Sequence, residues 1–507
     1  MTRPRVKLIT LPWELEVPTL GLASLAAVTP PQFDIAIVDL LRERLHLDEP
    51  VDLVGITAST PRIKAAYLLA EVYRRKGVTV VLGGHHATAM PDEALEHADA
   101  VVVGEGETSW KRLCEDFLSS PSKVRGLYRD PAPDLSTLPQ PRLDLVHLER
   151  YGAWYYPLIA SRGCPEACSF CFAKRMTLGY RTYPIAHVLE QVRRRPAWVR
   201  GAYFVDDNLT ADPDYARELF KALERFGLTF GMQSRHEFSR SADDLERARR
   251  AGCILVSCGY ESINQHSLDG TGKRALAEVY RETTKAQFDA GLIPSGNWMF
   301  GFDWDGPDIF ERTLEFLDST HLLHASFTTE IPFPGTQAWK TYKLEGRLVS
   351  EDYDDYVGKD HVLVRPKQMT PTQLRDGIRW LATSFYSVRR SARRARLALS
   401  NPHLAPIGAT RVPALLGLQA YQMWQWRYRM VPSLQWLYER LLSVNKYQYV
   451  QDALRGSNFW RSEHAPVGGP SDDEVGLTGP FRRQQGHKPS PARPLVPLLA
   501  GVRNPSR

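Results

Sequence analysis

Apolar positions in the first 130 residues follow two kinds of pattern that alternate along the chain. Short runs rich in valine and isoleucine predict strands at residues 6–10, 33–39, 52–57, 78–82 and 100–103. Between them, apolar residues at helical spacing predict helices at residues 20–28 and 63–76. This alternation predicts an α/β domain in which a parallel sheet has helices on both faces and binds ligands beyond the carboxyl ends of its strands.

Two glycine-rich segments follow predicted strands in this domain. One is Gly83-Gly84-His85-His86-Ala87-Thr88, and the other is Gly104-Glu105-Gly106-Glu107. Glycine at a strand end lets the backbone approach a bulky ligand closely. The segments therefore mark a candidate ligand site, although a doubly wound domain of any function can carry similar turns.

A second series of strands begins after a linker at residues 131–155, which holds prolines at positions 131, 133, 139 and 141. The first strand of this series is predicted at residues 158–161. Later predicted strands end in polar side chains, namely Asp206, Asp207, Gln233, Arg235, Glu261, Ser262, Asn297 and Glu330. In β/α barrels the reactive residues lie where the strands end. The second series of strands with polar ends therefore predicts a barrel at residues 156–340 with its site at that edge.

The loop after the first predicted barrel strand carries three closely spaced cysteines. Cys164, Cys168 and Cys171 have the spacing C-x-x-x-C-x-x-C, which suits three thiolates on three irons of a four-iron cluster and leaves the fourth iron open. The alternatives are a zinc site or scattered buried cysteines. Zinc normally takes four ligands, often as two C-x-x-C pairs, and no second pair follows.

Composition indicates a large globular protein. The 507 residues predict two or three domains, and 43% hydrophobic with 24% charged residues is ordinary for such proteins. The net charge of +6 is spread over many positions. Three dispersed cysteines, Cys114, Cys253 and Cys258, form no disulfide framework, and the last two are predicted to be small core residues.

We expect a cytoplasmic protein from the absence of targeting signals. The N-terminus has no signal-like apolar core, and no stretch approaches the ~18 uninterrupted apolar residues of a membrane span. Cysteine usage without disulfides fits a reducing compartment. A peripheral contact with a membrane stays open. A nucleic-acid partner is not expected, because no basic groove with interleaved aromatics precedes residue 388.

The cysteine loop, with the aromatic Phe172 after it, resembles the radical S-adenosylmethionine (SAM) superfamily. In addition, the run Val54–Thr57 and the two glycine-rich segments resemble a cobalamin-binding domain of the type fused ahead of radical SAM barrels. The resemblance covers roughly residues 1–400. It implies a Rossmann-like, doubly wound cobalamin domain at 1–130, followed by a partial (β/α)6 TIM-type barrel.

The resemblance also implies roles for individual residues. Cys164, Cys168 and Cys171 would hold a [4Fe–4S] cluster. SAM would be bound by Phe170, Asp206, Asp207, Gln233, Arg235, Glu261, Ser262 and Asn297, with the two aspartates at its amino group. An ammonium group favours carboxylate partners, and a carboxylate is held best by a guanidinium. Cobalamin would be bound by Thr57, Thr60, Arg62, Gly83, Gly84, His85, His86, Thr88, Gly104, Glu105, Gly106 and Glu107.

One departure from the family pattern concerns the cobalt. The motif D-x-H-x-x-G, which supplies a histidine ligand in some cobalamin domains, is absent from this chain. The resemblance then implies that Thr60 or Arg62 faces the cobalt, whereas the ordinary interpretation is a helix start with Pro61 near its first position. His85 and His86 would line the ligand site or cap a strand.

The remaining chain is predicted to form a helical region at 341–460 and a disordered tail at 461–507, which is rich in Pro, Gly, Arg and Ser. The region after the barrel resembles the C-terminal extension of related enzymes, including the hopanoid methylase group. Val388–Arg396 is strongly basic, and 419–428 holds several aromatic residues. These segments form either a solvated face and a core stripe, or a surface that contacts anionic lipid or covers an apolar substrate.

The resemblance implies a cobalamin-dependent radical SAM methyltransferase. Such an enzyme moves a methyl group from SAM, via methylcobalamin, to an unactivated carbon of a small-molecule, natural-product or lipid substrate. It would need a flavodoxin- or ferredoxin-type electron donor. One alternative is a non-methylating cyclisation or rearrangement on the same scaffold, and a second is a cobalamin or redox sensor.

Overall fold

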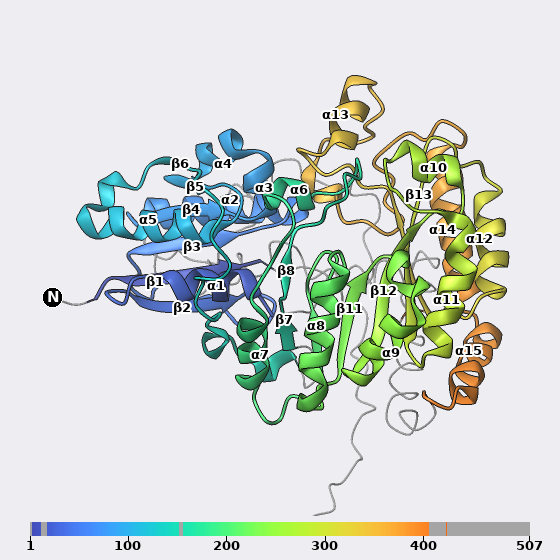
Figure 1. Ribbon diagram of the computed structural model, residues 1–507. Coiled ribbons are helices and arrows are strands. Elements are labelled where there is room, and N and C mark those ends of the chain that lie inside the picture. Colours follow the sequence, from blue (N-terminus) through green and yellow to red (C-terminus); the bar gives the residue numbers. More distant parts are fainter. Residues whose placement is uncertain (1–2, 12–17, 152–155, 405–421, 423–507) are drawn as a thin grey trace, which may run out of the picture.

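The computed structural model describes residues 3–11, 18–151, 156–404 and 422 of the chain. It contains two six-stranded parallel sheets, which lie side by side in Figure 1 with the first sheet in blue and the second in green to yellow. No helix in these residues is long and apolar enough to cross a membrane. The predicted aromatic segment at 419–428, apart from residue 422, and the predicted tail at 461–507 lie outside the described residues.

The first sheet has the strand order β2-β1-β3-β4-β5-β6, and every pair is parallel. The order reverses between β1 and β3, as in doubly wound folds, and this confirms the predicted fold class. Its strands are β1 (Arg5–Thr10), β2 (Asp34–Asp39), β3 (Leu53–Thr57), β4 (Thr79–Gly83), β5 (Ala100–Val102) and β6 (Gly126–Tyr128).

Helices cover both faces of the first sheet. Alternate residues of β3 point to opposite sides, so Leu53 packs with α1 and α5, whereas Val54 and Ile56 pack with α2 and α4. Burial on both faces explains why the strands are continuous apolar runs. The helices are α1 (Leu20–Val28), η1 (Thr60–Arg62), α2 (Ile63–Arg75), α3 (His85–Ala89), α4 (Pro91–His97), α5 (Gly106–Ser119) and η2 (Pro121–Lys123).

The second sheet has the strand order β14-β13-β12-β11-β10-β7, again with parallel pairing throughout. Within the described residues no pairing joins β7 to β14, so the barrel is open, as predicted. Its strands are β7 (Tyr156–Leu158), β10 (Ala202–Phe204), β11 (Phe230–Ser234), β12 (Cys253–Glu261), β13 (Ile293–Phe300) and β14 (His324–Thr329).

The connections of the barrel are mainly helices that lie outside the sheet in Figure 1. They follow the strand–helix alternation that the sequence predicts. These helices are α6 (Ala173–Met176), α7 (Ile185–Arg193), α8 (Pro213–Leu223), α9 (Ala242–Arg250), α10 (Gln265–Gly270), α11 (Tyr280–Asp289) and α12 (Ile309–Asp318). Short 3-10 turns occur at η3 (Leu143–Leu145), η4 (Leu148–Tyr151), η5 (Glu224–Phe226), η6 (His236–Arg240) and η7 (Ala277–Val279).

The first barrel strand differs from its prediction at 158–161. Strand β7 ends at Leu158, and a separate two-residue strand, β8 (Ser161–Arg162), pairs antiparallel with β9 (Arg181–Thr182). The cause is Asp206, whose carboxylate accepts hydrogen bonds from the backbone N–H groups of Ala160 and Ser161. These donors are therefore not used in the sheet, and the chain turns before the cysteine loop.

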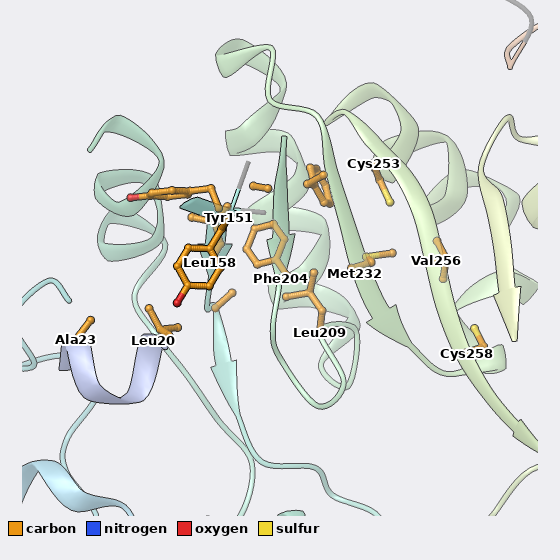
Figure 2. Packing of buried hydrophobic residues seen from close by; sticks show 14 of the residues in the cluster. Leu20, Ala23, Tyr151, Leu158, Phe204, Leu209, Met232, Cys253, Val256 and Cys258 are labelled. Carbon is orange, nitrogen blue, oxygen red and sulfur yellow. The ribbon is translucent and has the colours of Figure 1, made fainter. Parts of the chain in front are cut away.

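Beyond the barrel lie α13 (Gln337–Leu344), η8 (Tyr353–Asp355), α14 (Pro371–Phe385) and α15 (Val388–Ser400). Helix α14 packs against α12 and β14. Figure 2 shows part of an apolar cluster that continues from Leu20 of α1 through Leu158 and Phe204 to β12. Cys253 and Cys258 belong to this cluster and are buried, as predicted for core residues.

Candidate functional site

The cysteine loop, residues 164–171, follows β8 and is held by contacts at both ends. Gly163 precedes it with φ +79°, and a Cβ there would overlap the carbonyl oxygen of Gly179, so only glycine fits. Within the loop, the Ser169 N–H donates to the Thr271 carbonyl at 2.8 Å, and the Ser169 carbonyl accepts from Ala338 at 3.0 Å. The loop is thus fixed by the barrel and by the segment that leads into α13.

The three loop thiols differ from the other cysteines in accessibility. Cys171 is exposed and Cys164 and Cys168 are partly exposed, whereas the remaining three cysteines are buried. Desolvation raises the pKa of the Cys171 thiol to about 11, and Asp207, Cys168 and Cys164 add to the rise. The thiols are therefore close enough to interact electrostatically, as ligands of one cluster must be.

The donor set fits a cluster better than a single metal ion. In the described part of the chain, no three His, Cys, Asp or Glu side chains converge on one ion position. A [4Fe–4S] cluster needs one thiolate on each of three irons, and three accessible thiols in one loop meet that need. Cys164, Cys168 and Cys171 are thus the residues that would hold it.

Positive charge lies beside the loop. Burial raises the pKa of the Cys168 thiol, while Lys273 and Arg235 act in the opposite direction and favour the thiolate. Arg235 pairs with Glu166 of the loop, with 3.5 Å between Nη1 and Oε2. Lys273 pairs with Glu261 at 2.7 Å, and Glu261 has a left-handed backbone with φ 57°. Each cation is paired with a carboxylate, and both place positive charge close to the Cys168 thiol.

The adjacent acids Asp206 and Asp207 have different environments. Asp206 is buried and accepts hydrogen bonds from the Ala160 N–H and the Ser161 hydroxyl, the latter at 2.6 Å. Burial raises its pKa to about 7. Asp207 is exposed, and its pKa is raised by desolvation while a hydrogen bond from Gly163 lowers it. Of the two, only Asp207 presents an accessible carboxylate beside the thiols.

The other predicted SAM residues lie at or near the same edge of the barrel with unequal accessibility. Gln233 and Asn297 are half-buried, and Asn297 donates to the Ser257 hydroxyl at 3.1 Å. Ser262 is buried and accepts from the Asn264 N–H. Phe170 packs against Phe302, with 6.3 Å between ring centroids. Their contacts with SAM stay predictions.

On the first domain, the backbone is open at Gly104, whereas the other glycines of the two segments pack against protein atoms. Gly104 has φ +80°, its N–H donates to the Thr88 hydroxyl at 3.0 Å, and a Cβ there would meet no atom closer than Met176 O at 3.8 Å. A Cβ at Gly84 would overlap Thr57 Oγ1. The opening at Gly104 lets a bulky ligand approach the backbone, so this edge fits cobalamin.

The two histidines of the first glycine-rich segment have different positions. His86 is buried, with Thr60 Oγ1 3.2 Å from Nδ1 and Glu93 Oε1 3.3 Å from Nε2. Both ring nitrogens are thus engaged within the protein, which argues against a direct contact with a cofactor. His85 is exposed, and its ring centroid lies 5.6 Å from that of Phe172, directly after the cysteine loop.

The loop predicted to face the cobalt is packed against the C-terminal region. Thr60 is buried against His86, and η1 contacts η8. Lys64 pairs with Asp352 at 2.6 Å, and Tyr353 donates to Glu93 at 2.8 Å. The equivalent loop after β1, residues 12–17, lies outside the described residues. The roles of Thr60 and Arg62 at cobalt stay predictions.

A buried ion-pair network, which we call the domain latch, joins the two halves at this edge. Arg162, directly before Gly163, pairs with Glu105 at 2.8 Å and with Glu107 at 2.5 Å, and Arg181 also pairs with Glu105. Both glutamates were predicted to contact cobalamin; in the structure their carboxylates bind arginines, and a contact with cobalamin stays a prediction. Sequence analysis missed Arg162 and Arg181, because partners 55 or more residues apart leave no local signal.

Comparisons with known families agree with this architecture. Residues 6–113 match the B12 binding domain, and residues 158–317 match the radical SAM superfamily. The first sheet and its edge at Gly104 thus belong to a cobalamin-binding domain, and the open barrel with its cysteine loop belongs to a radical SAM domain. This chain is a member of the cobalamin-binding radical SAM family, and its cofactors are cobalamin, a [4Fe–4S] cluster and SAM.

Individual relatives place the chain among enzymes. Bacteriochlorophyllide d C-8(2)-methyltransferase of Chlorobaculum tepidum is 29% identical over 372 residues, covering 69% of this chain and 82% of the relative. The anaerobic magnesium-protoporphyrin IX monomethyl ester cyclase of Cereibacter sphaeroides is 26% identical, with 68% and 61% covered. The radical SAM methyltransferase TsrM from Kitasatospora setae shares the fold, with a TM-score of 0.62, 14% identity, and 84% and 99% covered.

Proposed function

We propose that this protein is a C-methyltransferase that moves a methyl group of SAM, by way of cobalamin, to an unactivated carbon of a small-molecule, natural-product or lipid substrate. The observation that carries the proposal is the contact between the two cofactor-bearing edges. His85 lies against Phe172, and Gly104 faces Met176, so the open edge of the first domain adjoins the cysteine loop. A substrate between them would reach both cofactors.

The chain's own residues prepare this reaction by holding charge and position. When bound, cobalamin supplies a carrier for the methyl group, and a cluster with one open iron supplies the electron that cleaves SAM to a carbon radical. Asp207 offers an accessible carboxylate for the ammonium group of SAM. Arg235 and Lys273 balance the negative charge of the thiolates. A flavodoxin- or ferredoxin-type protein would deliver the electron.

A second candidate is ring formation without methyl transfer. The similarity to a cyclase at 26% identity supports it, since that relative is only slightly less similar than the methyltransferase at 29%. The two candidates share the radical step and differ in the fate of the methyl group. Their products therefore distinguish them.

Anaerobic product analysis tests the proposal. The full chain is reconstituted with iron and sulfide, then given SAM, a strong reductant and hydroxocobalamin, and both SAM products are quantified by mass spectrometry. We expect S-adenosylhomocysteine and 5′-deoxyadenosine, the former only when cobalamin is present. Deoxyadenosine alone would favour ring formation.

Cysteine variants test the cluster assignment separately. Cys164→Ala, Cys168→Ala and Cys171→Ala should each abolish SAM cleavage while cobalamin stays bound. Cys253→Ala is the matched control, because that thiol is buried in the core. It should keep its iron content and cleavage activity. Full cleavage by any loop variant would contradict the assignment.

A further inference from the structure

A cavity lies far from the cofactor edge. It has a volume of about 350 Å³ and lies between α15 and residues 317–321, which form the end of α12 and the start of its connection to β14. Its charged and titratable lining consists of Asp318, His321, Arg390, Arg393, Arg394 and Arg396. We call it the α15 pocket.

Positive charge in the α15 pocket exceeds negative charge. The single lining carboxylate, Asp318, pairs with Arg390 at 2.8 Å. Arg393 and Arg396 are exposed and form no ion pair with any other residue that the structure describes. Positions 390, 393 and 394 share one face of α15, because residues three and four apart on a helix are neighbours. Guanidinium groups therefore converge on the cavity from successive turns.

Arg394 is the anomalous member of this set. It is only 6% exposed, yet no carboxylate binds it. It donates to the Phe385 carbonyl at 2.8 Å and to the Ser391 hydroxyl at 3.1 Å, and its Nε has no partner among the described residues. Burial lowers its pKa to about 10, and Tyr386 and Asp318 offset only part of that effect. The Phe385 ring, whose centroid lies 3.8 Å from Arg394 Cζ, offsets part of the burial cost. A buried cation without a counter-charge is still costly, so a bound anion would lower the free energy of this site.

We propose that the α15 pocket binds a phosphate-bearing anion. A phosphate group presents several charged oxygens, and arginines that approach from different directions can each donate to one of them. The unpaired, exposed guanidinium groups of Arg393 and Arg396 supply such donors, and Arg394 adds its positive charge to the lining. The ligand is either a free phosphate compound or the phosphate of a lipid headgroup, since both offer the same chemistry.

The α15 pocket lies at the opposite end of the barrel strands from the cysteine loop. Residues 319–323 enter β14 at its amino end, whereas the cysteine loop lies at the carboxyl ends of the barrel strands. Figure 1 shows α15 at the lower right and α6, which follows the cysteine loop, in the upper part of the molecule. The anion therefore binds as an effector or an anchor, and the proposal does not depend on the proposed function.

A charge-matched pair of variants tests the site in the full, cofactor-loaded chain. Arg393 lines the pocket and Arg389 does not, although both are exposed on α15. The melting temperature is measured in potassium phosphate against potassium chloride of equal ionic strength. We expect phosphate to raise it, and the half-effective concentration to increase about tenfold in Arg393→Gln and Arg394→Met. Arg389→Gln should stay within about twofold of the unmodified protein.

Vesicle flotation distinguishes the two sources. Flotation with vesicles of phosphatidic acid and phosphatidylcholine that needs Arg393 but not Arg389 would assign a lipid headgroup. A response to inorganic phosphate without flotation would assign a free phosphate compound. The proposal is overturned if neither probe has an effect, or if Arg389→Gln weakens the response as much as Arg393→Gln. Arg393 is exposed, so its variant decides the question even if Arg394→Met fails to fold.

Discussion

Arg162 and Arg394 are both buried arginines, and the chain treats their charges in opposite ways. In the domain latch, Arg162 is 11% exposed and binds Glu105 and Glu107. In the α15 pocket, Arg394 binds a carbonyl and a hydroxyl but no carboxylate. Burial lowers the pKa of Arg162, but Glu107 and Glu105 outweigh this effect and raise the pKa above its ordinary value. Burial lowers the pKa of Arg394 to about 10.

The difference in partners distinguishes an arginine whose charge stabilises the fold from an arginine whose charge has no carboxylate partner in the described part of the protein. The cost of burying a guanidinium is met inside the domain latch by two glutamates of the other domain. That arrangement fixes Arg162, and with it the glycine that begins the cysteine loop. In the α15 pocket no carboxylate binds Arg394 to offset this cost, and the Phe385 ring and two hydrogen bonds offset only part of it. We infer that an unmet buried charge marks a binding site in this protein, and a met one marks an interface.

The largest effect is expected when the domain latch loses one glutamate. Glu107→Gln leaves Arg162 buried with a single carboxylate partner, and breaking a buried pair costs about 3 kcal/mol or more of unfolding free energy. Urea denaturation measures the loss. Glu190→Gln is the control, because Glu190 pairs with Arg194 on an exposed surface and should change stability by about 0.5 kcal/mol or less.

The Glu107→Gln variant can also contradict the interpretation that Arg162 carries a structural charge. If Glu107→Gln keeps full stability but loses cobalamin binding, the carboxylate serves the cofactor, as the sequence resemblance implied, and Arg162 does not depend on it. Absorbance titration with hydroxocobalamin measures this binding independently of stability.

A buried acid without a cation partner is the reverse case of Arg394, and its burial should make the unfolding free energy depend on pH. Glu330 is 3% exposed, and its hydrogen bond comes from Tyr342 at 2.7 Å. Burial raises its pKa from 4.5 to about 7. Between these values the folded state keeps a proton that the unfolded state has lost. Unfolding free energy therefore falls as pH rises from 4.5 to 7, by about 3 kcal/mol for this group.

Glu330→Gln should remove this part of the decline, because glutamine accepts the same hydrogen bond without titrating. Chemical denaturation at several pH values measures the slope. Asp206, with a pKa raised to about 7, adds a decline of the same sign, so the difference between the variant and the unmodified protein is the quantity to compare. The exposed Glu311 provides the control. Parallel slopes for all three proteins would contradict the prediction.

Local patterns predicted most of the fold and part of the site. The helix at 20–28 and the strands of the first sheet other than β6 agree with their predicted bounds within about a residue, because burial on both faces makes such strands continuous apolar runs. Strand β6 was missed because its segment Gly126–Tyr128 has no run of valine and isoleucine, whereas the equally short β5 lies in the valine-rich run 100–103. The early end of β7 was also missed, because its cause is Asp206, more than forty residues away.

The site residues divide in the same way, into those that a local pattern predicts and those that depend on distant residues. The cysteine loop is local in sequence, so its spacing alone predicted three neighbouring thiols. Asp206 and Asp207 are adjacent and chemically equal in the sequence, and only the folded chain shows that one holds a turn while the other is accessible. The domain latch and the unmet charge of Arg394 depend on tertiary contacts, which no local pattern encodes.

The smallest effect is expected at Arg394 itself, and its sign distinguishes the two arginines most sharply. Without phosphate, Arg394→Met removes a buried charge that no carboxylate balances, and this gain offsets the lost hydrogen bonds to Phe385 and Ser391 and the lost contact with the Phe385 ring. We expect the unfolding free energy to change by about 1 kcal/mol or less, measured by urea denaturation in chloride buffer. A loss of about 3 kcal/mol, like that at Glu107, would mean that Arg394 is a structural cation after all. Because methionine carries no positive charge, stabilisation by phosphate should need about tenfold more phosphate in this variant even where basal stability is kept. If Arg394→Met and the unmodified protein are equally stable in chloride but differ in phosphate, the charge of Arg394 serves ligand binding and not the stability of the fold.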